Sequence, residues 1–169
     1  MTALQQVKAA VVNALEDAGL TAMSAYSEEQ LKKYTTAVTA VGLREMRLTE
    51  SGAMEYLGER HDTVQGTVLE VYGKRLTLSL SFDVYAPRTL GAEGCEEAAE
   101  EITQVMMSAL PSGLHVRELT WGKTEWDKTY GMFHISAQAA YEAYFVAETE
   151  EETAVFIDFI LKGVVRAHE

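Results

Sequence analysis

The feature that most constrains the fold is residues 76–85, where apolar and mostly polar side chains alternate strictly. Successive side chains of a β-strand point to opposite faces of the sheet, so a period of two places the apolar ones together. A strand with one apolar face is typical of an antiparallel sheet covered on one side only. The apolar members are Leu76, Leu78, Leu80, Phe82 and Val84.

Other segments predict further strands around this one. Residues 64–72 and 75–85 predict a β-hairpin, with Gly73-Lys74 as its tight turn. Residues 35–49 predict a strand with a slip in register, and the glycine-containing, charged residues 50–63 predict an exposed connection. Strands are also predicted over 114–121 and 129–146, joined by Gly122–Lys128. The second of these alternates through Phe133, Ile135, Ala137, Ala139, Tyr141, Ala143 and Phe145.

Two amphipathic helices are predicted. Residues 3–18 repeat apolar side chains at steps of three and four, with Thr2 as a cap and Gly19 as a stop. The second helix, residues 92–110, ends before Pro111-Ser112-Gly113, and we expect it to cover the apolar face of the hairpin. Its apolar face comprises Cys95, Ala98, Ala99, Ile102, Val105, Met106 and Ala109.

These patterns predict a single α+β domain spanning residues 1–169, since the chain shows no linker, repeat or low-complexity tract. We expect an antiparallel sheet of about five to six strands, an N-terminal helix and a second helix packed on one face. A capping-box pattern at residues 27–30 predicts a short helical turn. Residues 153–166 alternate as a strand does, but Thr149 and Glu152 would also cap a helix, so both structures remain open.

The composition excludes several classes of protein. A formal net charge of −12 disfavours nucleic-acid binding and docking on anionic membranes. The chain has no apolar stretch of the roughly 20 residues that span a bilayer, and no basic segment followed by an apolar run at its start. Its one cysteine excludes an intramolecular disulfide. We therefore expect a cytoplasmic protein that binds neither nucleic acid nor membrane.

The sequence offers little catalytic chemistry. Its four histidines have no metal-ligand spacing to one another or to Cys95, and no phosphate-binding or nucleophile motif occurs. Cys95 lies on the apolar face of the second helix among several glutamates, which indicates a buried small hydrophobe. His134 lies on the polar face of its strand and is interpreted as a surface or cross-strand histidine. We expect no enzyme activity and no cofactor.

The order of elements resembles the tail terminator (tail completion) family of long-tailed phages and prophages. The shared layout is a helix, a strand, a strand pair across Gly73-Lys74, a helix ending at Pro111-Ser112-Gly113, and further strands. In that family the segment resembling Leu76–Tyr85 leads directly into the second helix, and Val116–Trp121 and Thr129–Val146 look like its final strands. The resemblance covers residues 3–146; it has no clear match for residues 52–62 or 155–165.

The resemblance implies a six-membered ring that caps the tail tube and joins it to the head-connector proteins, without a cofactor. Such a protein occurs in the host cytoplasm and then in the virion. Ring contacts of this kind are heterologous and use exposed loops and sheet edges. The candidate interface residues are Glu55, Arg60, Gly73, Lys74, Trp121 and Trp126.

Alternatives remain open for the aromatic cluster and for the function. Trp121, Trp126 and Tyr130 either form a partner-binding edge or pack across the base of a hairpin. The protein is alternatively a head–tail connector or neck protein, or an unrelated small-molecule-binding or enzymatic α+β domain. An apolar pocket with converging polar groups would favour the last of these.

Overall fold

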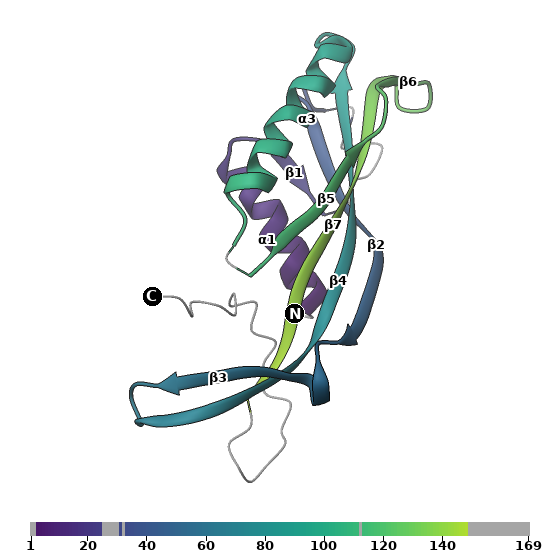
Figure 1. The fold of residues 1–169 in the computed structure, drawn as a ribbon. Helices are drawn as coiled ribbons and strands as arrows, with labels where there is room; N and C mark the ends of the chain where they lie inside the picture. Colours follow the sequence, from purple (N-terminus) through teal and green to yellow (C-terminus); the bar gives the residue numbers. More distant parts are fainter. Residues whose placement is uncertain (1–2, 25–30, 32, 112, 149–169) are drawn as a thin grey trace.

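The computed structural model describes residues 3–24, 31, 33–111 and 113–148 (Figure 1). Over these residues the chain forms two α-helices packed on a seven-stranded mixed sheet, so the predicted α+β class is confirmed. The sheet has more strands than the five to six predicted, and it is not wholly antiparallel. None of the helices formed by this part of the chain has the length and apolar character needed to cross a membrane.

The sheet is built around two long central strands, β4 and β7. The strand order is β1-β2-β4-β7-β5, with β3 also paired to β4 and β6 to β7. The β1–β2 pair is parallel and the other pairs are antiparallel. The strands are β1 Thr21–Met23, β2 Val38–Glu50, β3 Tyr56–Asp62, β4 Thr67–Pro87, β5 His115–Trp121, β6 Glu125–Asp127 and β7 Met132–Glu148.

The predicted tight turn at Gly73-Lys74 is wrong. Strand β4 runs unbroken through this pair, with Gly73 opposite Val146 and Lys74 opposite Phe145 of β7. The ladder to β7 holds the backbone extended at a dipeptide that on its own suits a turn. The actual turn lies at residues 63–66, and it contains the left-handed conformation that favours glycine, at Gly66 (φ 67°).

The predicted exposed connection over residues 50–63 is also wrong, because most of it is strand. Strand β2 ends with Glu50 opposite Lys74, and β3 starts with Tyr56 opposite Tyr72. A short 3-10 helix, η1 (Ala53–Glu55), lies between them. Strands β2 and β3 therefore form one interrupted leg of a long hairpin whose other leg is β4.

One end of this hairpin projects beyond the rest of the sheet (Figure 1). The β4–β7 ladder ends where Val71 faces Glu148, whereas β3 continues along β4 to the pair of Asp62 and Thr67. In the described part of the chain the end of the hairpin is thus two strands wide. We call β3 together with residues 67–72 of β4 the β3–β4 ribbon.

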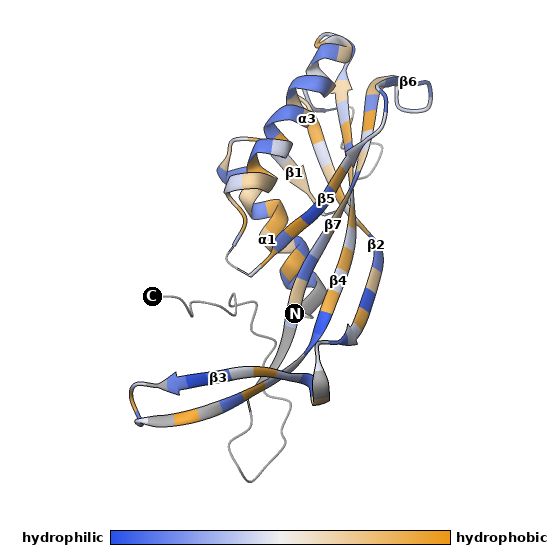
Figure 2. Ribbon diagram, viewed as in Figure 1, coloured by the Kyte–Doolittle hydropathy of each residue, from blue (hydrophilic) through white to orange (hydrophobic). Residues whose placement is uncertain are grey.

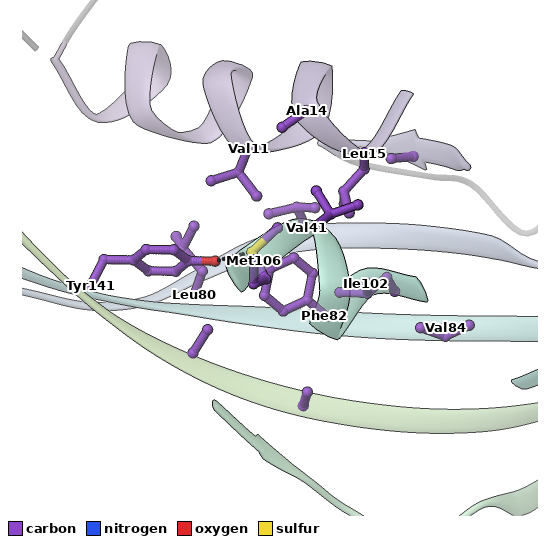
Figure 3. Close-up of a cluster of buried hydrophobic side chains, with 14 of the residues drawn as sticks. Val11, Ala14, Leu15, Val41, Leu80, Phe82, Val84, Ile102, Met106 and Tyr141 are labelled. Carbon is purple, nitrogen blue, oxygen red and sulfur yellow. Dashed lines mark hydrogen bonds between the residues drawn. The ribbon is translucent and has the colours of Figure 1, made fainter. Parts of the chain in front are cut away.

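Both predicted helices are confirmed to within two residues: α1 is Ala3–Asp17 and α3 is Gly91–Ser108. They cover the face of the sheet that carries the alternating apolar residues of β4, and Figure 2 shows apolar colour where the layers meet. Ala109 is exposed, contrary to the prediction, because α3 ends one residue before it. Figure 3 shows part of the resulting core, including Val11, Val41, Leu80, Phe82, Ile102 and Tyr141.

The remaining strand predictions are confirmed in part. The slip in register predicted for residues 35–49 is a bulge in β2 between Leu43 and Glu45. The predicted strands at 114–121 and 129–146 are β5 and β7, while the connection between them contains the unpredicted β6. Thr2, the capping box at 27–30 and the segment 153–166 lie outside the described residues.

Candidate subunit interface

The six candidate interface residues lie at two ends of the sheet. Glu55, Gly73 and Lys74 meet at the base of the β3–β4 ribbon, and Arg60 lies further along it, opposite Leu69. The two tryptophans belong to the other end, where Figure 1 shows β6. The structure therefore brings four of the six to the ribbon.

At the ribbon base, two side-chain contacts hold the η1 loop against β4. The ammonium group of Lys74 lies 2.8 Å from a carboxylate oxygen of Glu55. This hydrogen bond, and the negative charge of Glu55, raise the pKa of Lys74. The hydroxyl of Ser51 donates a hydrogen bond to the carbonyl oxygen of Gly73. Both members of the ion pair are partly exposed, so its main effect is to position the loop and not to stabilise the fold.

The η1 loop has an uncommon backbone conformation. Met54 (φ 58°) and Glu55 (φ 63°) are both in the left-handed region without being glycine. Each such residue costs about 1 kcal/mol or more, so surrounding contacts must hold the conformation. The Met54 side chain is 90% exposed. The loop thus presents a large apolar side chain to solvent beside the Glu55–Lys74 pair.

The ribbon itself exposes aromatic, aliphatic and charged side chains. The rings of Tyr56 and Tyr72 meet edge to face at 5.6 Å. The Tyr72 hydroxyl donates to a carboxylate oxygen of Glu70 at 2.5 Å, which raises the pKa of Tyr72. Val68 is 50% exposed, and Val64 in the turn is 92% exposed. Exposed apolar side chains gathered on one projection are typical of a contact surface.

At the opposite end of the sheet, the aromatic residues differ in their surroundings. The indole N–H of Trp121 donates to the Thr103 hydroxyl at 3.0 Å, which ties β5 to α3. The Tyr130 ring packs edge to face on Tyr85, with ring centres 5.3 Å apart. Trp126 packs on Phe133 but keeps 41% of its surface exposed. Packing within the fold accounts for Trp121 and Tyr130, whereas Trp126 retains surface for a partner.

The two residues that the sequence analysis considered for catalysis, Cys95 and His134, both make contacts within the fold. Cys95 is fully buried, with its sulfur 3.8 Å from the Val84 carbonyl oxygen, and burial raises the pKa of this thiol to about 11. His134 lies 3.0 Å from a carboxylate oxygen of Asp83 and stacks on Tyr85, as a cross-strand histidine does. Among the residues that the structure describes, no group of three or more His, Cys, Asp or Glu is placed to hold a metal ion.

A groove that the sequence did not predict lies between the end of α3 and β5. Its volume is about 550 Å³, and its walls include Met106, Met107 and Leu119. The hydroxyls of α3 here already have partners: those of Thr103 and Ser108 donate to backbone carbonyls one turn earlier, and that of Thr103 also accepts from Trp121. They do not converge on the groove as the polar groups of a small-molecule site do.

The candidate interface residues thus lie on two separate surfaces, one at the ribbon and its base and one near β6. A subunit with two different contact surfaces is suited to heterologous association. No protein-family model and no curated protein matches the chain. The functional assignment therefore depends on the fold and on these surfaces.

Proposed function

We propose that the chain is a structural assembly protein of a phage or prophage virion, which forms an oligomeric ring, caps the tail tube and joins the tail to the head. The observation that carries the proposal is the β3–β4 ribbon, which in the described part of the chain continues beyond Glu148, the last described residue of β7. The arrangement of one helix before the long hairpin and one after it supports the resemblance to tail terminators.

The ribbon is a poor structure for an isolated subunit. Two-stranded ribbons are marginally stable in water unless a third strand or another layer covers them. The ribbon exposes Tyr56 and Val68, and the turn at its end exposes Val64, so a partner that covers these side chains would stabilise the ribbon and bury its apolar surface. In a homo-oligomer that partner is the neighbouring subunit.

A ring follows if the ribbon of one subunit contacts a different surface of the next. Such head-to-tail contacts close when the rotation between subunits divides the circle. Strand pairing and apolar contacts at the ribbon then give the contact its energy, while Arg60 and the Glu55–Lys74 pair set its direction. Trp126 at the other end is available for a second contact, with a neighbouring subunit or with the tail tube.

The mass of the assembly tests the proposal. We expect light scattering on a sizing column, at high protein concentration, to give about six times 18.7 kDa, with rings in negative-stain images. A ring of another size would favour a head–tail connector or neck protein. A monomer that also fails to bind isolated tail tubes would refute ring formation, and ligand screening by thermal stabilisation would follow.

A substitution on the ribbon tests the surface. Val68→Glu places a charge on a half-exposed side chain, so we expect at least a tenfold weaker assembly and little change in the thermal midpoint. Leu90→Glu, at a side chain 43% exposed at the start of α3, is the matched control and should assemble normally. Equal assembly of the two variants, measured by sedimentation across a dilution series, would exclude the ribbon as the contact.

A further inference from the structure

Two borders of the sheet are open in the part of the chain that the structure describes. Strand β5 ends the strand order and pairs, within those residues, with β7 alone. At the other border β1 pairs with β2 at residues 38–40, so residues 41–50 have a described strand only on their β4 side. Figure 1 shows β2 and β5 on opposite sides of the sheet. Open edges present backbone N–H and C=O groups that can pair with a strand of another chain.

Both borders carry apolar side chains on the side of the sheet that the helices cover. Leu43, Met46 and Leu48 of β2 pair with leucines of β4 that are at most 1% exposed. The three β2 side chains are themselves 41%, 54% and 50% exposed. On β5, Val116 and Leu119 lie on the same side of the sheet and line the groove beside α3. The β2 border therefore lacks a cover over its apolar side chains, whereas the β5 border lies next to a helix.

We propose that β2 of one subunit pairs with β5 of the next, so that the sheet continues from subunit to subunit. The inference rests on the self-assembly proposed above, and it adds a contact between strands to the contact made by the ribbon. The two borders differ from each other, as a head-to-tail contact requires. The apolar side chains of β2 then lie beside Val116 and Leu119, at the groove of the neighbouring subunit. Met107 in the wall of that groove is 83% exposed and is available to cover them.

The directions and levels of the two strands agree with this pairing. Strands β2 and β7 are antiparallel to β4, and β5 is antiparallel to β7, so β2 and β5 run in opposite directions. Copies related by rotation about an axis along the strands therefore meet as an antiparallel pair, with each residue at the same level in both subunits. Through the ladders across β4 and β7, Val116 is level with Met46, and Leu119 is level with Leu43. Apolar residues of the two borders thus meet.

The residues between these apolar levels match in number and in charge. Because β2 has a bulge there, it has two residues, Arg44 and Glu45, where β4 has one. Strand β5 also has a bulge, and it has Arg117 and Glu118 where β7 has one. In the proposed register Arg117 comes opposite Glu45, and Glu118 comes opposite Arg44. Opposite charges on facing residues favour an antiparallel pair of strands.

Other registers lose this match. A shift by one residue turns the apolar side chains of one strand away from those of the other. A shift by two residues places Arg117 opposite Arg47 in one direction and opposite Leu43 in the other. The proposed register contains one pair of basic residues, His115 with Arg47, which repel each other only when the histidine is protonated. The side chains therefore select the register that the levels of the two borders give.

Disulfide formation tests the register. In the full-length protein with Met46→Cys and Val116→Cys, mild oxidation should link chain to chain and give a ladder of multimers on a non-reducing gel. Within one chain the two positions are three strand spacings apart, roughly 14 Å, which is too far for a disulfide. Met46→Cys with Thr120→Cys is the control pair and should link at least about tenfold more slowly, because position 120 is further along β5 and on the other face. Cys95 is buried in both proteins.

The outcomes separate this inference from the proposed function. A mixture of the single variants Met46→Cys and Val116→Cys should give linked dimers, whereas neither variant should form a link alone. A link in Met46→Cys alone would show that β2 meets β2, and would overturn the inference. Chains that assemble, but link positions 46 and 116 no faster than the control pair, would overturn the inference and leave the proposed ring. Chains that do not assemble, even with isolated tail tubes, would overturn both.

Charge reversal tests the pairing without cysteines. Arg44→Glu places two glutamates opposite each other and should weaken assembly at least about fivefold, measured by sedimentation across a dilution series. Glu118→Arg in the same chain should restore assembly to within about twofold of the native protein. Arg88→Glu, at an exposed position beyond the end of β4, changes the net charge equally and should assemble normally. Equal weakening by Arg44→Glu and Arg88→Glu, or no restoration by Glu118→Arg, would overturn the inference.

Discussion

Replacing Phe82 with alanine should lower the free energy of unfolding by about 3–5 kcal/mol, a large share of the stability of a domain this size. Phe82 is fully buried in the hydrophobic core that the sheet forms with the two helices (Figure 3). Truncation removes most of the ring and leaves a cavity that close-packed neighbours fill only in part. Urea denaturation followed by circular dichroism measures the loss.

The matched control for Phe82 is Met107→Ala on α3. Met107 is 83% exposed, so its truncation should change the free energy of unfolding by no more than about 0.5 kcal/mol. If Phe82→Ala cost as little as this control, the packing of the helices on β4 would be different from that described.

The Cys95 thiol should react with a disulfide reagent at pH 8 at least about a hundredfold faster in the unfolded chain than in the native one. Two causes act together. The side chain is inaccessible, and burial raises its pKa to about 11, so little thiolate is present at pH 8. Rates in native buffer and in guanidinium chloride give the ratio, and Met107→Cys in the native protein supplies the exposed reference. A native Cys95 that reacted as fast as Cys at position 107 would contradict its burial.

The raised pKa of Cys95 also makes the free energy of unfolding depend on pH in a definite direction. Because the folded thiol has the higher pKa, its contribution is complete below the ordinary value of 9.0 and decreases as the pH rises toward about 11. Cys95→Ser is not a suitable comparison, since it buries a hydroxyl. In Cys95→Ala, the decrease in the free energy of unfolding that the Cys95 thiol causes as the pH rises toward about 11 should be absent.

Local periodicity predicted the parts of the fold that depend on one chain segment at a time. The alternation from Leu76 to Val84 and the spacing within α1 and α3 each determine a buried face, and most residues of those faces are buried as expected, Ala109 being an exception. The turn at Gly73-Lys74 failed because its conformation is set by hydrogen bonds to β7, about seventy residues further along the chain. No residue near Gly73-Lys74 in the sequence indicates that β7 is its partner.

Strand β3 was missed for a related reason. Its sequence, Tyr56–Asp62, contains a glycine and several charged residues, and it has no apolar alternation because it lies on a ribbon with no core beneath it. The Glu55–Lys74 pair was likewise hidden, since each residue was assigned to a different exposed segment. Trp121 was recognised as an aromatic near a strand end, but its bond to Thr103 depends on how α3 lies on the sheet.

The interruption between β2 and β3 also bears on how this protein tolerates insertions and deletions. Between the pairs Glu50–Lys74 and Tyr56–Tyr72, one leg of the hairpin has five residues where the other has only Gly73. The continuous strand β4 sets the partners on both sides of that loop, independently of its length. Related chains are therefore free to gain or lose residues at 51–55 while every strand keeps its register and every core side chain its face.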